Sequence, residues 1–316
     1  MRIGVAVCGA ALLLGVSLSA ASGADNVIGV SFPHADQPIV AKILSFAEQK
    51  ADTMGYTIVV DDPGDDLTRQ VGNLETWIDG KVVSDIVAVV PNSPEVFNDI
   101  ATRARAAGIP WITYAASIDD ESTFLSWDHK ASGRLVGEAA AKWINEQQGG
   151  TAKVAILGFE QGEWSRQRRA GIEEALKELA PGAEIVAQQD ALQPSEGAAV
   201  TDSILQAHPD LNVVLAVVPG GGEGAYQAFL NAGKAKDDPG IFIGDIDGSA
   251  RSLSLIQEGT MYRAAAALDL QAIGEAIPVI ASQVSGDAKM DGVLIPYVMI
   301  TTANGAEAQR FIDQWN

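Results

Sequence analysis

The hydrophobic pattern alternates between two periods along most of the chain. Short apolar runs rich in β-branched residues, such as 85–90, have the length and composition of buried strands. Longer segments follow them and repeat their apolar positions every three or four residues, as in 37–53, where Ile39, Ile43 and Phe46 share one face. Strands that alternate with helices in this way predict parallel sheets with helices on both faces.

The alternation runs through two successive rounds. The predicted strands are 27–30, 56–60, 85–90, 109–114 and 123–127 in the first round, and 152–157, 184–187, 212–218, 241–243, 260–268 and 293–301 in the second. The predicted helices are 37–53, 67–78 and 94–107, then 130–145, 164–179, 196–207, 223–231, 249–257, 270–284 and 306–315. Two rounds predict two α/β lobes with a first crossing near Trp127 and Asp128. The unit from Leu268 to Tyr297 is expected to return to the first lobe.

Residues 1–24 have the pattern of a secretory signal peptide. Arg2 precedes an apolar run that ends at Leu18, and small residues lead to a predicted cleavage site after Ala24. The run is shorter than the ~18 residues that a membrane-spanning helix needs. We therefore expect an exported protein of the periplasm.

Composition excludes several classes of function. Cys8 is the only cysteine and lies within the predicted signal peptide, so the mature chain offers no disulfide, thiol nucleophile or cysteine metal ligand. A formal net charge of −20 disfavours nucleic acids and anionic membranes as partners. His34, His129 and His208 are scattered without metal-ligand spacing, and no hydrolase motif is present. We expect no metal, no cofactor and no catalytic residue.

One motif leaves a distant enzymatic alternative open. Gly220, Gly222 and Ala225 form a Gly-x-Gly-x-x-Ala pattern between a predicted strand and helix, a weak fingerprint of dinucleotide binding. It follows a proline in an exported chain, where an oxidoreductase is unexpected. The glycines are better suited to the close approach of a ligand or of backbone.

Several segments occur in the order and spacing of one protein family. They are Ile28-Gly29-Val30-Ser31, Ala51-Asp52-Thr53-Met54-Gly55-Tyr56, Ala107-Gly108-Ile109-Pro110, Ala131-Ser132-Gly133, Arg168-Arg169-Ala170-Gly171, Ala207-His208-Pro209-Asp210 and Gly244-Asp245-Ile246-Asp247-Gly248. Together they resemble the ribose-binding family of periplasmic proteins that serve ABC importers. The resemblance implies the type I periplasmic-binding-protein-like fold, with two doubly wound parallel-sheet lobes, a three-crossing hinge, a ligand held between the lobes and no chemistry performed.

This resemblance sets the expected organisation and partners. The N-terminal lobe is expected to hold 25–127 with 269–296, and the C-terminal lobe 128–268 with 297–316. A monomer would close on its ligand and deliver it to an ABC permease of the inner membrane. A receptor of the same fold that reports to a chemoreceptor or sensor kinase is the alternative, which the sequence does not separate from import.

Candidate ligand contacts lie in loops after the strands, since ligands of open α/β sheets sit outside the carboxyl ends of the strands. A sugar site needs planar donors and acceptors for hydroxyl groups and an aromatic face for the C–H side of the ring. The candidates are Phe32, His34, Asp36, Gln37, Asn92, Tyr114, Trp164, Arg166, Arg168, Pro219, Glu223, Asp245, Asp247, Asp269 and Gln271.

The resemblance ranks these residues only in part. Arg168 matches the family's guanidinium contact, with Arg166 as an alternative nearer the loop. Asp247 matches the family's aspartate, with Asp245 as an alternative because this loop is one residue longer. Asp269 and Gln271 lie where the family places a polar contact at a crossing. Whether the glycine loop from Gly220 to Gly222 touches the ligand stays open.

Two departures from the family pattern bear on the ligand. Ala115-Ala116 replaces an Asp-Arg pair of the aldose binders, and the stretch from Val218 to Gly222 stands where Asn-Asp is frequent. Both changes remove hydroxyl-binding groups. We therefore expect a small polar ligand, with a sugar, polyol or modified sugar preferred and an unrelated small polar compound as the alternative, rather than ribose, glucose or galactose themselves.

Overall fold

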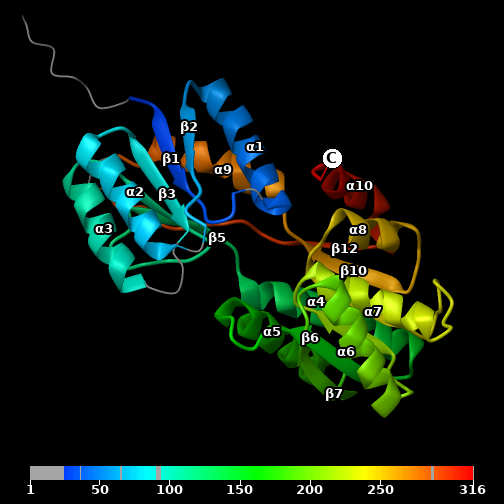
Figure 1. The fold of residues 1–316 in the computed structure, drawn as a ribbon. Coiled ribbons are helices and arrows are strands. Elements are labelled where there is room, and N and C mark those ends of the chain that lie inside the picture. Colours follow the sequence, from blue (N-terminus) through cyan, green and yellow to red (C-terminus); the bar gives the residue numbers. More distant parts are fainter. Residues whose placement is uncertain (1–24, 36, 65, 90–93, 286–287, 316) are drawn as a thin grey trace, which may run out of the picture.

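The chain folds into two α/β lobes joined by extended segments (Figure 1). The computed structural model describes residues 25–35, 37–64, 66–89, 94–285 and 288–315. The predicted signal peptide and the candidates Asp36 and Asn92 lie outside the described residues. In the described part, no helix has both the length and the hydropathy needed to cross a bilayer.

The first lobe contains a six-stranded sheet in which every pairing is parallel. Its order is β11–β5–β4–β3–β1–β2. The strands are β1 (Val27–Ser31), β2 (Thr57–Asp61), β3 (Asp85–Val89), β4 (Trp111–Tyr114), β5 (Thr123–Ser126) and β11 (Val293–Leu294). Helices α1 (Pro38–Met54) and α9 (Leu270–Gln283) cover one face, and α2 (Leu67–Gly80) and α3 (Pro94–Ala106) cover the other. Trp111 and Tyr114 enter the cores on opposite faces, as their spacing predicts.

The second lobe repeats this arrangement, with sheet order β12–β10–β9–β8–β6–β7. Its strands are β6 (Thr151–Gly158), β7 (Gly182–Asp190), β8 (Val213–Ala216), β9 (Phe242–Asp247), β10 (Tyr262–Ala267) and β12 (Val298–Thr301). Helices α4 (His129–Gln147) and α5 (Glu163–Leu179) cover one face; α6 (Pro194–Ala207), α7 (Pro219–Asn231), α8 (Ala250–Gln257) and α10 (Gly305–Asp313) cover the other. A 3₁₀ turn, η1 (Thr302–Asn304), precedes α10. Only the edge strand β12 pairs in the antiparallel sense among the described strands.

The chain passes between the sheets three times. The passages lie between β5 and α4, between β10 and α9, and between β11 and β12. The prediction of one strand over 293–301 was wrong, because Val293–Leu294 pairs with β5 in one sheet and Val298–Thr301 pairs with β10 in the other. Pro296, which lacks a backbone N–H for a ladder, stands between them.

The strand order also locates the ends that can bind a ligand. In both sheets the order reverses between the first and third strands, at β1/β3 and at β6/β8. Ligands of doubly wound sheets bind outside the carboxyl ends at such a switch point. These ends lie at Phe32, just after β1, and at the residues that follow β6 and β8.

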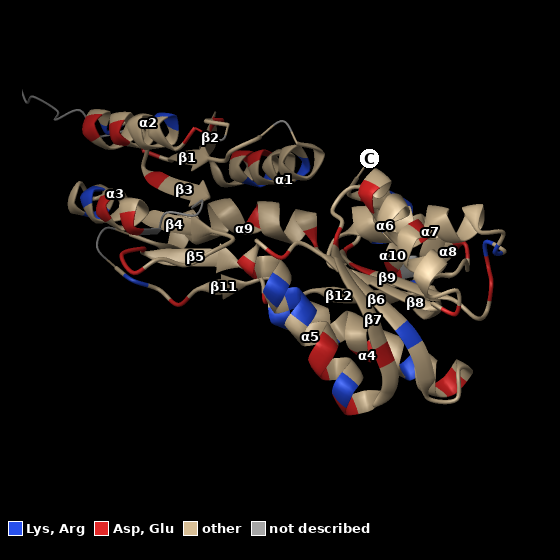
Figure 2. Cartoon of the chain, turned by 60° about the horizontal axis from the view of Figure 1, so that its bottom comes forward, with Lys and Arg blue, Asp and Glu red and all other residues tan. Residues whose placement is uncertain are grey.

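Acidic residues are spread over both lobes, whereas lysine and arginine gather on α5 (Figure 2). Arg166, Arg168, Arg169 and Lys177 all belong to this helix. The first three lie in its N-terminal half, next to the end of β6.

Candidate ligand-binding site

The Arg168 guanidinium makes the densest set of polar contacts in the described chain and lies at the β6/β8 switch point. Its Nη1 and Nη2 bond the Oδ2 and Oδ1 atoms of Asp247 at 2.7 and 2.8 Å. Nη1 also donates to the carbonyl oxygen of Val217 at 2.7 Å, and Nη2 to the hydroxyl of Tyr297 at 2.8 Å. Nε points to Nδ1 of His129 at 3.3 Å. All five N–H donors of the guanidinium are therefore used.

Burial makes this pair sensitive to any change in either partner. The Arg168 side chain is 4% exposed and that of Asp247 is 17% exposed. Burial by itself lowers the pKa of Arg168, but Asp247 and Tyr297 outweigh it, and the pKa is raised overall. The two charges cancel within the pair, while Oδ2 of Asp247 keeps one lone pair free for a further donor.

Asp247 is held in an unusual backbone conformation. It is the last residue of β9 and has φ of +84°, in a region that side-chain-bearing residues rarely adopt. His34 after β1 and Ala115 after β4 also have positive φ values, 59° and 61°. All three follow or end a strand at its carboxyl end, and such conformations gather at functional sites.

Glycines on two helices bring Arg168 to this position. A Cβ atom at Gly133 of α4 would lie 1.9 Å from the carbonyl oxygen of Arg168, and one at Gly171 of α5 would lie 2.1 Å from that of Lys130. Only glycine allows α4 and α5 to pack this closely. The first turn of α4, which contains His129, is thereby placed against the guanidinium.

His129 has a neutral imidazole suited to this contact. Burial and the nearby positive charge of Arg168 lower the pKa of His129 to about 4. An unprotonated Nδ1 can accept the hydrogen bond from Nε of Arg168. His129 was not among the predicted ligand contacts, whereas the structure makes it a partner of the ion pair.

Aromatic rings form a continuous line from the first lobe to this pair. Phe32 and Tyr114 have ring centroids 4.4 Å apart, Tyr114 and Trp127 are 5.6 Å apart edge to face, and Trp127 and His129 are 6.1 Å apart. Trp127 is the residue of the first crossing, and its indole Nε1 is buried without a hydrogen-bond partner among the described residues. Beyond His129, Trp164 lies over Arg168 at 5.2 Å.

Asp245 lies in the interior of β9 rather than in the loop expected from the sequence. It is fully buried and accepts a hydrogen bond of 2.6 Å from the Tyr262 hydroxyl. Burial raises the pKa of Asp245 to about 7. Of the two aspartates that the sequence offered, only Asp247 reaches the Arg168 pair.

Glu223 and Pro219 belong to the first turns of α7, so the expected glycine loop from Gly220 to Gly222 is helical. The Glu223 carboxylate accepts a hydrogen bond from the Ser249 hydroxyl. Cβ atoms at Gly220 and Gly222 would lie 2.1 Å from the Leu192 carbonyl oxygen and 2.2 Å from the Tyr262 hydroxyl. The glycines admit the chain's own backbone and side chains at these points.

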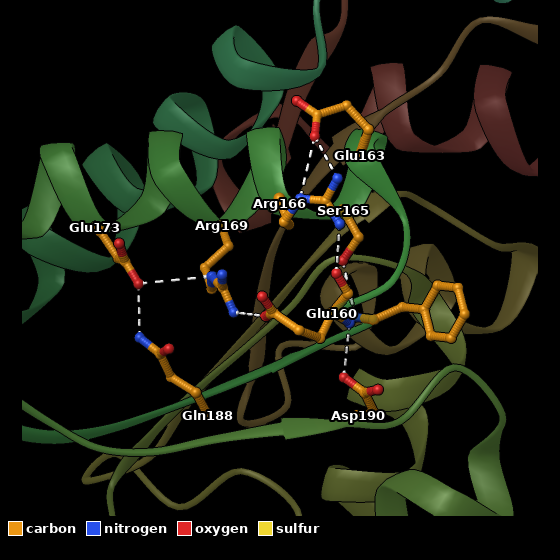
Figure 3. A network of polar contacts seen from close by, with 9 residues as sticks. Glu160, Glu163, Ser165, Arg166, Arg169, Glu173, Gln188 and Asp190 are labelled. Carbon is orange, nitrogen blue, oxygen red and sulfur yellow. Dashed lines mark hydrogen bonds and ion pairs between the residues drawn. The ribbon is translucent and has the colours of Figure 1, made fainter. Parts of the chain in front are cut away.

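Arg166 belongs to a separate surface network (Figure 3). It contacts the Glu163 carboxylate and the Glu160 carbonyl oxygen, and Arg169 pairs with the Glu160 carboxylate. The backbone N–H of Glu160 donates to Asp190 at 2.9 Å. Since Arg166 and Arg168 point to different partners, only Arg168 joins the buried pair.

Asp269 and Gln271 are engaged at the start of α9. Asp269 accepts from the backbone N–H of Ala272 as the helix N-cap and pairs with Arg310 of α10 at 2.7 Å. Gln271 is exposed, and its amide donates to Glu275. Neither side chain contacts the Arg168–Asp247 pair.

The loop after β1 supplies the remaining described candidates. The backbone N–H of His34 donates to Asp62 at 3.0 Å, and Gln37 occupies the exposed N-cap position of α1. Phe32 is almost fully buried beside Tyr114. The structure thus brings Phe32, Tyr114, Trp164, Arg168 and Asp247 together along one line.

Sequence reasoning missed Tyr297, which completes the site. Its hydroxyl accepts from Arg168 and donates to Oδ1 of Asp247 at 3.1 Å. Burial and the Asp247 charge raise the pKa of Tyr297, so the hydroxyl keeps its proton. No pattern in the sequence marks this residue, because it was placed inside a predicted strand. Among the described residues no group of three or more histidine, cysteine, aspartate or glutamate side chains is arranged to hold a metal.

Comparison with known proteins gives a consistent picture. A family model described as "Periplasmic binding protein domain" matches residues 28–288. The ABC transporter periplasmic-binding protein YphF of Escherichia coli (strain K12) is 30% identical over 58% of this chain and 63% of its own length. The ribose import binding protein RbsB of Haemophilus influenzae is 26% identical over 79% of this chain and 83% of its own.

Solved structures share the fold. An ABC transporter solute binding protein from Bacillus halodurans C-125, solved with bound myo-inositol, superposes with a TM-score of 0.77 at 24% identity, covering 92% of this chain and 99% of that one.

Proposed function

The chain belongs to the periplasmic binding protein family, and from this we propose that it captures a small neutral polyhydroxy compound between its lobes and delivers it to an ABC importer. The compound class is a sugar, a polyol or a modified sugar. The observation that carries the proposal is the Arg168–Asp247 pair at the carboxyl ends of the second sheet, with the line of rings leading to it from the first lobe.

The charge balance of the site favours an uncharged ligand. A free guanidinium would attract an acid and a free carboxylate would attract an amine, whereas here each neutralises the other. The remaining lone pair on Oδ2 of Asp247 can accept a hydrogen bond from a hydroxyl group. Asp247 is therefore the direct ligand acceptor, and Arg168 holds it in place.

The first lobe contributes apolar contact rather than charge. Ala115 follows β4 and packs against the hydrophobic cluster that contains the rings of Phe32 and Tyr114. Aromatic faces pack well against the C–H side of a polyhydroxy ring. A relative named for ribose import and a neighbour with bound myo-inositol are consistent with a compact ring as the ligand.

Binding is expected to proceed by hinge closure without a chemical step. A ligand that contacts both lobes only in the closed form shifts the population toward closure. The protein acts as a monomer in the periplasm, exported by residues 1–24 with cleavage near Ala24, and the closed form docks on the permease. Reporting to a chemoreceptor or sensor kinase is the second role that the same binding supports.

A thermal-shift panel tests this proposal. It contains pentoses, myo-inositol and other polyols, modified sugars, amino acids and small aromatic acids. At least one polyhydroxy compound should raise the melting temperature in proportion to the logarithm of its excess over Kd. Asp247→Asn should lose that shift, measured from its own ligand-free melting point, while the exposed Asp210→Asn keeps it. A shift with an amino acid or aromatic acid alone would refute the polyhydroxy class.

A further inference from the structure

Tyr297 stands where the third crossing between the lobes meets the ligand site. Two residues before it, the backbone N–H of Ile295 donates to the carbonyl oxygen of Ser126 at 2.9 Å, which fixes Ile295 to the first sheet. Tyr297 itself bonds Arg168 and Asp247 in the second lobe. The change of lobe is thus confined to the few bonds around Pro296.

The Tyr297 ring belongs to both lobes. It packs against the buried cluster of the first lobe that includes Tyr114 and Leu268, and against the cluster of the second lobe that includes Val136 and Ile246. Its ring also lies 5.9 Å from the guanidinium carbon of Arg168. Rotation of one lobe against the other must therefore move this ring, its hydroxyl, or both.

The hydroxyl of Tyr297 shares its acceptor with the incoming ligand. Its 3.1 Å bond to Oδ1 is the longest of the contacts that Asp247 makes with Arg168 and Tyr297. Arg168 and Tyr297 use both lone pairs of Oδ1, and Oδ2 keeps one free, so a ligand that donates more than one hydroxyl to this carboxylate competes with Tyr297 for Oδ1. Ligand binding at Asp247 therefore acts directly on Tyr297, the last residue of the crossing.

We propose that Tyr297 is a positioning residue that couples occupancy of the ligand site to the angle between the lobes. In the empty protein, its hydroxyl holds the third crossing against the Arg168–Asp247 pair. When a ligand binds Asp247, this bond is redistributed and the crossing is free to adopt the closed angle. The ligand side of this proposal rests on the proposed function, whereas the hold on the hinge does not.

Tyr297→Phe isolates the hydroxyl while keeping the ring. Tyr226→Phe is the matched control, because Tyr226 is a buried tyrosine of the same lobe on α7, away from the pair. Cys8 is changed to serine, and spin labels are attached at Val96→Cys on α3 and Leu179→Cys on α5, both exposed positions in opposite lobes. Inter-label distances are recorded without ligand and with myo-inositol or D-ribose.

The ligand-free distance distribution should broaden in Tyr297→Phe and match the unsubstituted protein in Tyr226→Phe. For whichever of the two probes binds, Kd should fall about tenfold in Tyr297→Phe, because the lost hydrogen bond to a charged group stabilised the ligand-free form and competed with the ligand for Asp247. Equal distributions in the two tyrosine variants would overturn the proposal, as would a broadened distribution with an unchanged or raised Kd. If neither myo-inositol nor D-ribose binds the unsubstituted protein, these two compounds are not its ligands. The ligand-free distance distributions of Tyr297→Phe and Tyr226→Phe then still decide whether Tyr297 holds the hinge.

Discussion

Arg168 of α5 and Asp247 of β9 lie 79 residues apart in the chain and meet through two parallel hydrogen bonds of 2.7 and 2.8 Å. Such a two-point contact fixes both the distance and the plane of the carboxylate. The positive φ of Asp247 directs its side chain toward α5, and the glycine contacts between α4 and α5 bring the guanidinium to meet it. The proposed acceptor for the ligand is thus fixed by contacts within the protein itself.

The interdependence of the pair predicts a non-additive mutant cycle. Arg168→Met and Asp247→Asn should each lower the free energy of unfolding by about 3 kcal/mol or more, because each leaves a buried charge without its partner. The double variant should lose clearly less than the sum of the two. Urea denaturation of the three variants measures this, and strictly additive losses would contradict the buried pair.

The close packing of α4 and α5 predicts a specific sensitivity at Gly133. Gly133→Ala places a methyl group against the carbonyl oxygen of Arg168, so the helices must separate and Arg168 must move. We expect a loss of about 1–3 kcal/mol in unfolding free energy, as for other overpacked sites. Ligand binding should weaken as well.

Gly72 provides the matched control for this substitution. It lies inside α2, where an added Cβ atom would meet no neighbour within 4 Å. Gly72→Ala should therefore stabilise the protein by about 0.5–1 kcal/mol through helix propensity. If both glycine variants changed stability in the same direction, packing between α4 and α5 would not be the cause.

His129 predicts a dependence of stability on pH. Its pKa is about 4 in the folded protein and 6.5 in an unperturbed histidine. Between these pH values His129 is therefore protonated in the unfolded chain and neutral in the folded protein. Its contribution is complete above pH 6.5 and falls as pH decreases toward 4, by up to about 1.4 kcal/mol per unit. His129→Gln, which keeps an acceptor for Arg168, should remove this decline.

The comparison with His129→Gln is needed because Asp245 acts in the opposite sense. Its pKa is raised to about 7, so its contribution is complete below the ordinary value of 3.8 and is lost as pH rises through 7. Chemical denaturation at pH 7 and pH 5 gives the unfolding free energies of His129→Gln and of the unsubstituted protein. Because Asp245 is present in both proteins, its contribution cancels in the difference between their unfolding free energies. An identical difference at both pH values would show that His129 is not buried against Arg168.

Gln314 predicts a stabilising contact between α10 and the start of α9. Its Oε1 accepts from the backbone N–H groups of Leu270 and Gln271 at 3.0 and 3.4 Å, and it is 4% exposed. Gln314→Leu would leave these donors unpaired and should lower the unfolding free energy by about 1–3 kcal/mol. Gln309→Leu on the exposed side of the same helix should change it by less than about 0.5 kcal/mol. Equal losses of unfolding free energy in the two variants would show that the Gln314 contacts with α9 do not stabilise the protein.

The architecture followed from the sequence because the alternation of strands and helices has few solutions. The apolar run from Val293 to Thr301 was wrongly predicted as one strand, because both halves favour strand structure. Only the tertiary fold assigns the two halves to different sheets. The glycines after Pro219 resembled a loop, yet contact with α6 and Tyr262 makes them the first turn of α7. Local pattern does not contain these contacts.

Site residues could be predicted only where they lie in a short segment with a recognisable sequence pattern. Arg168 and Asp247 lie beside strand ends in segments that resemble a known family, and the structure joins them. His129 and Tyr297 lie at crossings, where their partners are distant in the chain. Their roles depend on the approach of α4, α5 and the third crossing, which no spacing along the sequence encodes.

The central claim is that a polyhydroxy ligand bound at Asp247 closes the two lobes. Small-angle X-ray scattering tests it most directly, on the protein alone and with a saturating amount of the panel compound that most raises its melting temperature. We predict that the radius of gyration decreases on addition of the compound and that Asp247→Asn shows no decrease. Saturation by that compound with an unchanged radius of gyration would contradict the account.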